Sequence, residues 1–278
     1  MRFGICNETF LDWPFDKAFA FAAACGYTGI EIAPFTLASD VRNISSASRN
    51  EVRRQAAAAG LEIIGLHWLL AKTEGFHLTS PVPSVRRTTA EYFAHLTRLC
   101  ADLGGLIMVL GSPQQRSLPP DVTQQQAADF AVEVLSRTVL VLEQTGVQLV
   151  IEPLSPVETD FLTTAQQVVE LIGRIGSPAV RLHLDCKATA TEQESIPALI
   201  VRHHDVMVHF HANDPNRQGP GFGALDFVPI FQALCDVDYR GWVSVEVFDS
   251  TPGIERLARE SIEYMRRCAA KQIGTILP

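Results

Sequence analysis

The sequence has no cluster of Lys and Arg residues and no apolar run long enough to cross a bilayer, and each absence argues against a class of protein. Its 31 acidic residues outnumber its 23 Lys and Arg residues, for a net charge of −8, whereas nucleic-acid binding requires a basic surface. A membrane helix needs roughly 18 to 20 apolar residues, and a signal peptide needs an apolar core that the first ten residues lack. We therefore expect a soluble, cytoplasmic protein that binds neither nucleic acid nor a membrane.

Closely spaced cysteines are also missing. The six cysteines form no C-x-x-C pair and no zinc-finger spacing. A chain of 278 residues buries a large core and does not need disulfides. We expect the cysteines to be small buried hydrophobic residues, with the alternative that Cys6 and Cys186, near strand ends, line a pocket.

What the sequence does have is a regular alternation of strand-like and helical segments. Apolar runs predict eight strands, at residues 3–6, 29–33, 62–68, 106–111, 148–153, 180–185, 206–211 and 242–247. Helical spacing of apolar residues predicts eight helices, at 15–25, 48–59, 84–103, 123–144, 164–175, 192–201, 227–235 and 254–270. Five helical segments are followed by a glycine suited to a left-handed cap: Gly26, Gly60, Gly104, Gly146 and Gly176.

Eight strand–helix units with Val-, Ile- and Leu-rich strands indicate a parallel sheet covered by helices. At this length, a single (β/α)8 TIM barrel is the simplest closed topology. An open doubly wound sheet is the alternative, but no G-x-G-x-x-G follows the first strand. No linker or low-complexity stretch divides the chain, so we expect one domain over residues 1–278 with a C-terminal tail at 272–278.

Four acidic or imidazole side chains close four consecutive predicted strands: Glu152 in LVIEP, Asp185 in RLHLD, His211 in VHFHAND and Glu246 in VSVEV. Ligands gather at the carboxyl ends of barrel strands. Such groups are costly to bury unless something compensates them, and a shared divalent cation would do so. Three carboxylates and one imidazole suit Mn²⁺, Mg²⁺ or Co²⁺ better than a closed structural zinc site. Taken singly, each residue has an ordinary alternative, as a helix cap, an arginine partner or a core histidine.

The segments IEPLSPVETDFLTTA, RLHLDCKA, HFHANDPNRQGPGFGALDF and SVEVF resemble the sugar isomerase/epimerase family with the xylose-isomerase-like TIM barrel. That family includes ketose 3-epimerases, hydroxypyruvate isomerases and inosose dehydratases, and the resemblance covers essentially the whole chain. It implies one divalent metal ion held by the same four side chains. Mn²⁺ is the first choice, and Mg²⁺, Co²⁺ and Zn²⁺ are the alternatives. It also implies that Glu152 and Glu246 are the catalytic acid/base pair and that Arg217 and Glu158 contact the substrate.

The chemistry of these residues agrees with that implication. Removing a proton next to a carbonyl requires an electrophile on the oxygen, which a metal supplies, and a base at the carbon. Glu152 and Glu246, on opposite faces of the substrate, could deprotonate and reprotonate it through a metal-stabilised enediolate. We therefore expect an isomerase or epimerase acting on a sugar or keto-sugar. Arg217 would hold a substrate oxygen, with a surface ion pair to Asp214 as its alternative.

One position departs from the family pattern. Epimerases of the family resembled here carry a histidine three residues after the strand-six aspartate, where this chain has Ala188. Lys187 is a candidate replacement cation for the substrate, or else a loop lysine facing water. The change leaves open a second reaction type, a metal-dependent lyase or dehydratase acting on a keto-glycoside or an inosose.

Other polar residues lie near predicted strand ends. His67 and Trp68 would offer a sugar a hydrogen bond and an apolar face, or else form an ordinary packed pair. Substrate contact is one interpretation of Glu8 and Glu31. We expect His183 and His209 to pack inside the barrel or to support the metal ligands.

Two further classes stay open. A barrel-type endonuclease would need extra His or Asp ligands on the early strands and a positive rim, and His67 is the only early-strand histidine. A non-catalytic sugar-binding barrel would need an incomplete metal site. For the isomerase we expect a small-molecule sugar as ligand and a homo-oligomer, a dimer or tetramer.

Overall fold

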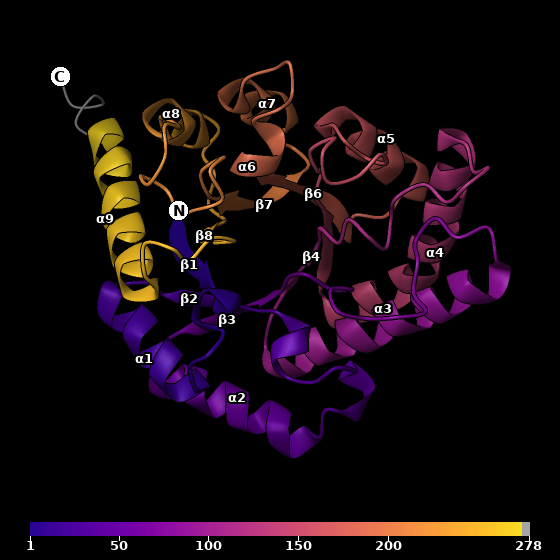
Figure 1. Cartoon of the computed structure of the whole chain (residues 1–278), viewed down its shortest axis with the longest axis horizontal. Coiled ribbons are helices and arrows are strands. Elements are labelled where there is room, and N and C mark those ends of the chain that lie inside the picture. The colour runs from indigo at the N-terminus through magenta and orange to yellow at the C-terminus, as the bar shows by residue number, and fades with distance from the viewer. Residues whose placement is uncertain (274–278) are drawn as a thin grey trace.

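The computed structural model, which describes residues 1–273, is a closed barrel of parallel strands surrounded by helices (Figure 1). Each strand pairs in parallel with the next, and the last pairs with the first. The strands are β1 (Arg2–Cys6), β2 (Gly29–Ile32), β3 (Glu62–Leu66), β4 (Ile107–Leu110), β5 (Gln148–Ile151), β6 (Val180–Asp185), β7 (Met207–Ala212) and β8 (Trp242–Val245). The predicted (β/α)8 TIM barrel is thus confirmed.

All eight predicted helical segments are present, with ends displaced by a few residues. They are α1 (Phe15–Cys25), α2 (Ser46–Ala58), α3 (Pro83–Leu103), α4 (Gln124–Thr145), α5 (Ala165–Ile175), α7 (Ile196–His203), α8 (Val228–Asp236) and α9 (Ile254–Ile273). Three short 3-10 helices, η1 (Asn7–Phe10), η2 (Pro34–Thr36) and η3 (Val41–Asn43), lie in the loops after β1 and β2.

The helix α4 shows how local sequence fixes these ends. At its start the Thr123 side chain accepts a hydrogen bond from the Gln126 amide, and the Gln126 side chain accepts one from the Thr123 amide. At its end Gly146 has φ of 74°, a left-handed conformation that costs glycine little. The chain can therefore turn back at once into β5.

The short helix α6 (Cys186–Thr189) was not predicted. It follows β6 directly and is capped by Asp185, whose side chain accepts a hydrogen bond from the Ala188 amide. A four-residue helix shows no periodic pattern, so only this cap marks it. Its effect is to aim Lys187 at the carboxyl end of the barrel.

Apolar side chains fill part of the barrel interior below that end. A cluster separate from the main core comprises Ile64, Ile107, Val109, Val150 and Trp242. These residues precede the strand ends, so water is excluded beneath the polar groups that follow them. Charges at the carboxyl end consequently lie over a low-dielectric floor.

Three sequence-based expectations concern the rest of the chain. All six cysteines are free thiols, and Cys6 and Cys186 are buried. The helix α9 extends through Ile273, two residues into the predicted tail, and the remainder of that tail lies outside the described residues. Within residues 1–273, no helix has the length and apolar character needed to cross a membrane.

Candidate active site

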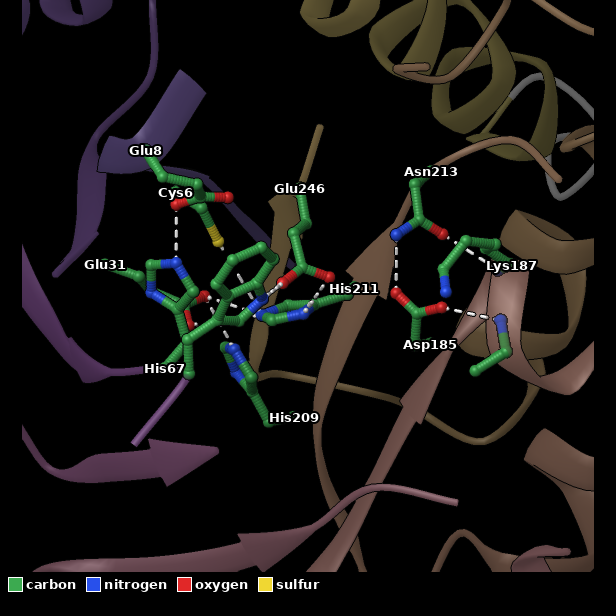
Figure 2. A network of polar contacts seen from close by, with 12 residues as sticks. Cys6, Glu8, Glu31, His67, Asp185, Lys187, His209, His211, Asn213 and Glu246 are labelled. Atoms are coloured by element: carbon green, nitrogen blue, oxygen red, sulfur yellow. Dashed lines mark hydrogen bonds and ion pairs between the residues drawn. The ribbon is translucent and has the colours of Figure 1, made fainter. Parts of the chain in front are cut away.

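Four buried side chains meet at the carboxyl ends of β5 to β8. Glu152 directly follows β5, Asp185 ends β6, His211 lies near the end of β7, and Glu246 directly follows β8. Their exposed fractions are 5%, 0%, 0% and 2%. Figure 2 shows Glu246 beside His211, and Asp185 next to this pair with its carboxylate turned toward Asn213.

The distances among these side chains suit a shared ion. Ligand atoms of Asp185, His211 and Glu246 all lie within 4.8 Å of one another, and those of Glu152 and Asp185 do too. His211 Nδ1 is 3.2 Å from Glu246 Oε2. Asp185 therefore links Glu152 to the other two, His211 and Glu246, and all four predicted ligands lie in two overlapping groups.

The electrostatics of the four groups suit a bound cation. Burial, with Asp185 and Glu246 adding to it, raises the pKa of Glu152 well above its usual range. Burial and then Glu246 raise the pKa of Asp185 to about 6. For His211 burial lowers the pKa, but Glu31 and Glu246 more than offset this and leave it well above its usual value. Since buried like charges repel, a divalent cation fits this donor set.

Asp185 is held in place by its neighbours. It accepts hydrogen bonds from the Ala188 amide at 2.7 Å and from Asn213 Nδ2 at 2.6 Å. Asn213 in turn accepts one from the Lys187 amide at 2.8 Å. Sequence reasoning missed Asn213, although it lies two residues after His211, on the same side of the chain.

The early strands supply a second layer of polar groups. Glu31, in β2, accepts hydrogen bonds from His209 Nε2 at 2.7 Å and from His211 Nε2 at 3.2 Å. Because Glu31 engages Nε2, the Nδ1 of His211 is left to face Glu246. Glu31 and His209 are completely buried inside the barrel and support His211 rather than line the cavity.

His67 and Trp68, adjacent in sequence, differ in their surroundings. His67 is completely buried, and its Nε2 lies 2.5 Å from Glu8 Oε2. Trp68 Nε1 donates to Glu246 Oε1 at 2.7 Å, and the indole lines the cavity above the four ligands. The structure thus brings Trp68 to the cavity and pairs His67 with Glu8 behind it.

The cavity has a volume of about 320 Å³ and opens beside Glu152 and Glu246. One wall is aromatic, since Trp68 stacks on Phe248 with ring centroids 5.7 Å apart and an interplanar angle of 24°. All but one of the predicted substrate residues line it: Trp68, Glu158, Lys187 and Arg217. His67 is the exception.

Lys187 contacts an acidic side chain and an aromatic ring rather than bulk water. Its Nζ donates to Glu158 Oε1 at 2.6 Å and lies 4.6 Å from the Phe248 ring centroid, and 13% of the side chain is exposed. Burial lowers the pKa of Lys187, but Asp185 and Glu158 raise it by more, so the amine stays charged. The cavity-facing alternative for Lys187 therefore fits the structure.

Arg217 does not pair with Asp214 in the described part of the chain. Its side chain is exposed at the cavity, whereas the Asp214 carboxylate is buried and accepts the Leu225 amide at 3.2 Å. Arg217 has φ of 73°, a left-handed conformation that non-glycine residues rarely adopt. The backbone thus holds Arg217 at the cavity mouth.

Two residues that fix the position of Glu152 could not be identified from the sequence. Arg116 is completely buried, and its Nη1 donates to the Glu152 carbonyl oxygen at 2.7 Å. Burial lowers the pKa of Arg116 to about 10. A Cβ at Gly111 would lie 1.7 Å from Glu152 Oε2, so only glycine leaves room for this carboxylate.

Comparison with known proteins gives one family. A model described as xylose isomerase-like TIM barrel matches residues 19–268. The chain is 27% identical over 230 residues to D-psicose 3-epimerase of Ruminiclostridium cellulolyticum, covering 81% of this chain and 75% of that protein. It is 22% identical over 275 residues to 3-dehydro-D-guloside 4-epimerase of Escherichia coli, covering 96% of this chain and 100% of the relative.

Solved structures show the same fold. A D-psicose 3-epimerase crystallised in the presence of D-fructose superposes with a TM-score of 0.85 at 23% identity, covering 97% of this chain and 99% of that one. A 3-keto-D-glucoside 4-epimerase from E. coli superposes with a TM-score of 0.84 at 21% identity, covering 96% of this chain and 100% of that one.

Proposed function

Because the chain belongs to the xylose isomerase-like TIM barrel family, we propose that it is a divalent-metal-dependent isomerase or epimerase of a sugar or keto-sugar. The observation that carries the proposal is the convergence of Glu152, Asp185, His211 and Glu246 beside one cavity. Relatives named as 3-epimerases and as a 4-epimerase support it, since both reactions invert a carbon next to a carbonyl.

The chain's own residues divide the work at the reacting carbon. When bound, the divalent cation polarises the carbonyl and stabilises negative charge on its oxygen. Glu152 and Glu246 come from strands β5 and β8, and both line the cavity. One carboxylate takes the proton from the carbon on its face, and the other returns a proton on the opposite face. The Trp68 hydrogen bond to Glu246 keeps one oxygen of that carboxylate oriented.

The side chains of the cavity wall are suited to binding a sugar. Trp68 and Phe248 offer an apolar surface to the C–H face of the ligand, and water is displaced from it on binding. Glu158, Lys187 and Arg217 offer hydrogen bonds to hydroxyl groups. A volume of about 320 Å³ lies at the small end of ligand pockets, as a monosaccharide requires.

Solvent exchange tests the proposal directly. The metal-loaded protein, incubated in D2O with ketoses, keto-glycosides and inososes, should incorporate deuterium at the carbon next to the carbonyl of its substrate. A chelator should abolish the exchange, and Mn²⁺ or Co²⁺ should restore it. Absence of deuterium in every compound of the panel would contradict the mechanism for those substrates.

A lyase or dehydratase is the second candidate, and Ala188 together with Lys187 favours it. The side chain at 188 offers no proton, whereas the partly buried Lys187–Glu158 pair lies in the cavity wall. Lys187 could protonate an oxygen that leaves from the carbon beyond the deprotonated one. An unsaturated product in the same D2O experiment, in place of an epimer, would identify this reaction.

We also infer a homo-oligomer, a dimer or tetramer, and a cytoplasmic location, as the sequence predicts. Light scattering after size-exclusion chromatography tests the first, and a mass equal to one chain would refute it.

A further inference from the structure

A second group of side chains able to bind a metal ion lies beside the first, at the carboxyl end of the barrel. Cys6 is the last residue of β1, Glu8 lies in η1, and His67 directly follows β3. Together with Glu246 they form the Cys6 group, whose ligand atoms all lie within 4.8 Å of one another. Figure 2 shows the three early-strand side chains together on one side of Glu246, with Asp185 on the other side. The two groups therefore share the Glu246 carboxylate.

The Cys6 group is buried, and most of it lies apart from the cavity wall. The exposed fraction is 0% for Cys6 and His67 and 2% for Glu246. The Glu8 side chain is 6% exposed, so an ion would enter past this carboxylate. Of the four residues, only Glu246 is among those that line the cavity. Contact with a bound sugar therefore does not explain why a thiol, an imidazole and a second carboxylate meet here.

Hydrogen bonds satisfy only part of the Cys6 group. His67 Nε2 lies 2.5 Å from Glu8 Oε2. Glu8 Oε1 and His67 Nδ1 are buried and have no hydrogen-bond partner within residues 1–273. The Cys6 sulfur makes a weak contact with His211 Nε2 at 3.9 Å. Because a buried polar atom without a partner is destabilising, the free oxygen of Glu8 favours a bound cation.

The pairing of Glu8 with His67 does not by itself complete the group. It engages one oxygen of Glu8 and leaves the Cys6 sulfur with its weak contact. Glu8 also lies near a second carboxylate, Glu246, and buried like charges repel. A divalent cation within reach of all four side chains would offset both carboxylates and engage the free oxygen of Glu8.

Glu246 has the capacity to belong to both groups. Its Oε2 lies 3.2 Å from His211 Nδ1, and its Oε1 accepts a hydrogen bond from Trp68 Nε1 at 2.7 Å. An ionised carboxylate has about four lone-pair sites. These two contacts occupy one site on each oxygen, so each oxygen keeps a lone pair for a metal ion.

The donor types of the Cys6 group select the ion. One thiolate, one imidazole and two carboxylates are ligands that Zn²⁺ binds in tetrahedral sites, with neighbouring ligand atoms ~3.3 Å apart. Thiolate is a soft ligand suited to Zn²⁺, whereas Mn²⁺ prefers carboxylate, carbonyl and water oxygens. Zn²⁺ would replace the thiol proton of Cys6 and the proton between Glu8 and His67, and both protons would pass to solvent.

We propose that the Cys6 group is a second metal site, which binds Zn²⁺ and leaves Mn²⁺ to the four ligands at the ends of β5 to β8. The inference goes beyond the proposed isomerase, because it concerns metal binding and requires no turnover. It rests on the mutual approach of four ligand side chains, on their burial and on the unpaired oxygen of Glu8.

Counting bound Zn²⁺ tests the site. Metal-stripped protein is titrated with Zn²⁺, and bound metal is counted after removal of the free ion. We expect two Zn²⁺ per chain for the parent and one for Cys6→Ser, while both bind one Mn²⁺. Cys100→Ser is the matched control, because Cys100 is also completely buried, and its Sγ donates to the Ile107 carbonyl at 3.4 Å, a hydrogen bond that serine can keep. This variant should bind two Zn²⁺.

Removing the other site isolates this one. Asp185→Ala should still bind one Zn²⁺, because Asp185 is not a member of the Cys6 group. With Co²⁺ in place of Zn²⁺, this variant should show the near-ultraviolet charge-transfer absorption of a thiolate–Co²⁺ bond. Adding Cys6→Ser to it should remove both the absorption and the bound ion. His67→Gln is a second test of the same ligand set, and it should bind one Zn²⁺ in the parental background.

Three results would overturn the proposal: one Zn²⁺ per chain in the parent, a second Zn²⁺ that persists in both Cys6→Ser and His67→Gln, or a Co²⁺ spectrum without the thiolate absorption. The site and the proposed function fail separately. Two Zn²⁺ per chain with no deuterium exchange in any substrate would refute the isomerase and leave the site standing. Deuterium exchange by a protein that binds a single Zn²⁺ would do the reverse.

Discussion

The two halves of the barrel have the same architecture but contribute differently to the candidate site. The late strands β5 to β8 end in four side chains that point toward one another, and all four are predicted metal ligands. The polar groups of the early half pair instead with neighbours: Glu8 with His67, Glu31 with His209, and Trp68 with Glu246. We therefore propose that the late half carries the chemistry and that the early half orients it.

This difference has a physical consequence for substitution. A group that touches the reacting atoms contributes to every turnover, whereas a group that fixes the orientation of a ligand changes its affinity by a smaller factor. Changes that remove or displace one of the four side chains at the ends of β5 to β8 should therefore cost the most activity, and changes to the groups that only orient those side chains should cost less. The predictions below test this ranking.

The largest effect is expected in the late half. Glu246→Gln removes a proposed proton carrier and one negative charge from the metal site, so turnover should fall by about 10²- to 10⁴-fold. Circular dichroism should show an unchanged fold. Glu170→Gln, on the exposed face of α5, is the control and should be as active as the parent. A Glu246→Gln variant with parental activity would remove the acid/base assignment.

The second-largest loss of turnover is expected at Gly111, directly after β4, where the missing side chain leaves space for the Glu152 carboxylate. Gly111→Ala places a Cβ 1.7 Å from the present position of Glu152 Oε2, so the carboxylate must move. Displacement of about 1 Å at a reacting group costs roughly 10²-fold in turnover. Gly173→Ala is the matched control, because its added Cβ meets no heavy atom within 4 Å. Equal steady-state rates for the two variants would contradict the assigned position of Glu152.

An intermediate effect is expected in the early half. Glu31→Gln weakens the hydrogen bonds that orient His211, so Mn²⁺ affinity measured by calorimetry should fall by about 10- to 100-fold while one Mn²⁺ still binds per chain. Complete loss of Mn²⁺ binding would show that Glu31 is itself a ligand, and the division between the halves would be wrong.

The smallest effect concerns the Lys187–Glu158 pair. Burial raises the pKa of Glu158, but the hydrogen bond and charge of Lys187 lower it by more, so the net pKa lies below its usual value. Stability from this pair is therefore present above the unfolded pKa of about 4.3 and is lost as the pH falls through the lower folded value. In metal-stripped protein, Lys187→Met should lower Tm at pH 7 and differ less from the parent near pH 3. A constant difference would contradict the pairing.

The sequence predicts the late half of the site better than the early half for a physical reason. Each late ligand ends an apolar run, so its position relative to the strand is visible locally, and neighbouring parallel strands bring the ends together. The contact between Trp68 and Glu246 joins residues 178 positions apart. No local pattern marks that contact.

The buried residues around Glu152 are a second part of the site that the sequence does not predict. Arg116 lies in a polar loop whose composition predicts exposure, yet its side chain is completely buried. Its burial depends on the carbonyl of Glu152, which only the folded barrel places beside it. Sequence reasoning likewise left Lys187 open between the cavity and the solvent, because its direction depends on the unpredicted helix α6.

Metal stoichiometry tests the central claim most directly. Metal-stripped protein is titrated with Mn²⁺, and bound metal is counted after removal of the free ion. We predict one Mn²⁺ per chain for the parent and none for Asp185→Ala, since Asp185 is the group that links Glu152 to His211 and Glu246. A parent that binds no Mn²⁺, or an Asp185→Ala variant that keeps one per chain at the parental affinity, would contradict the account.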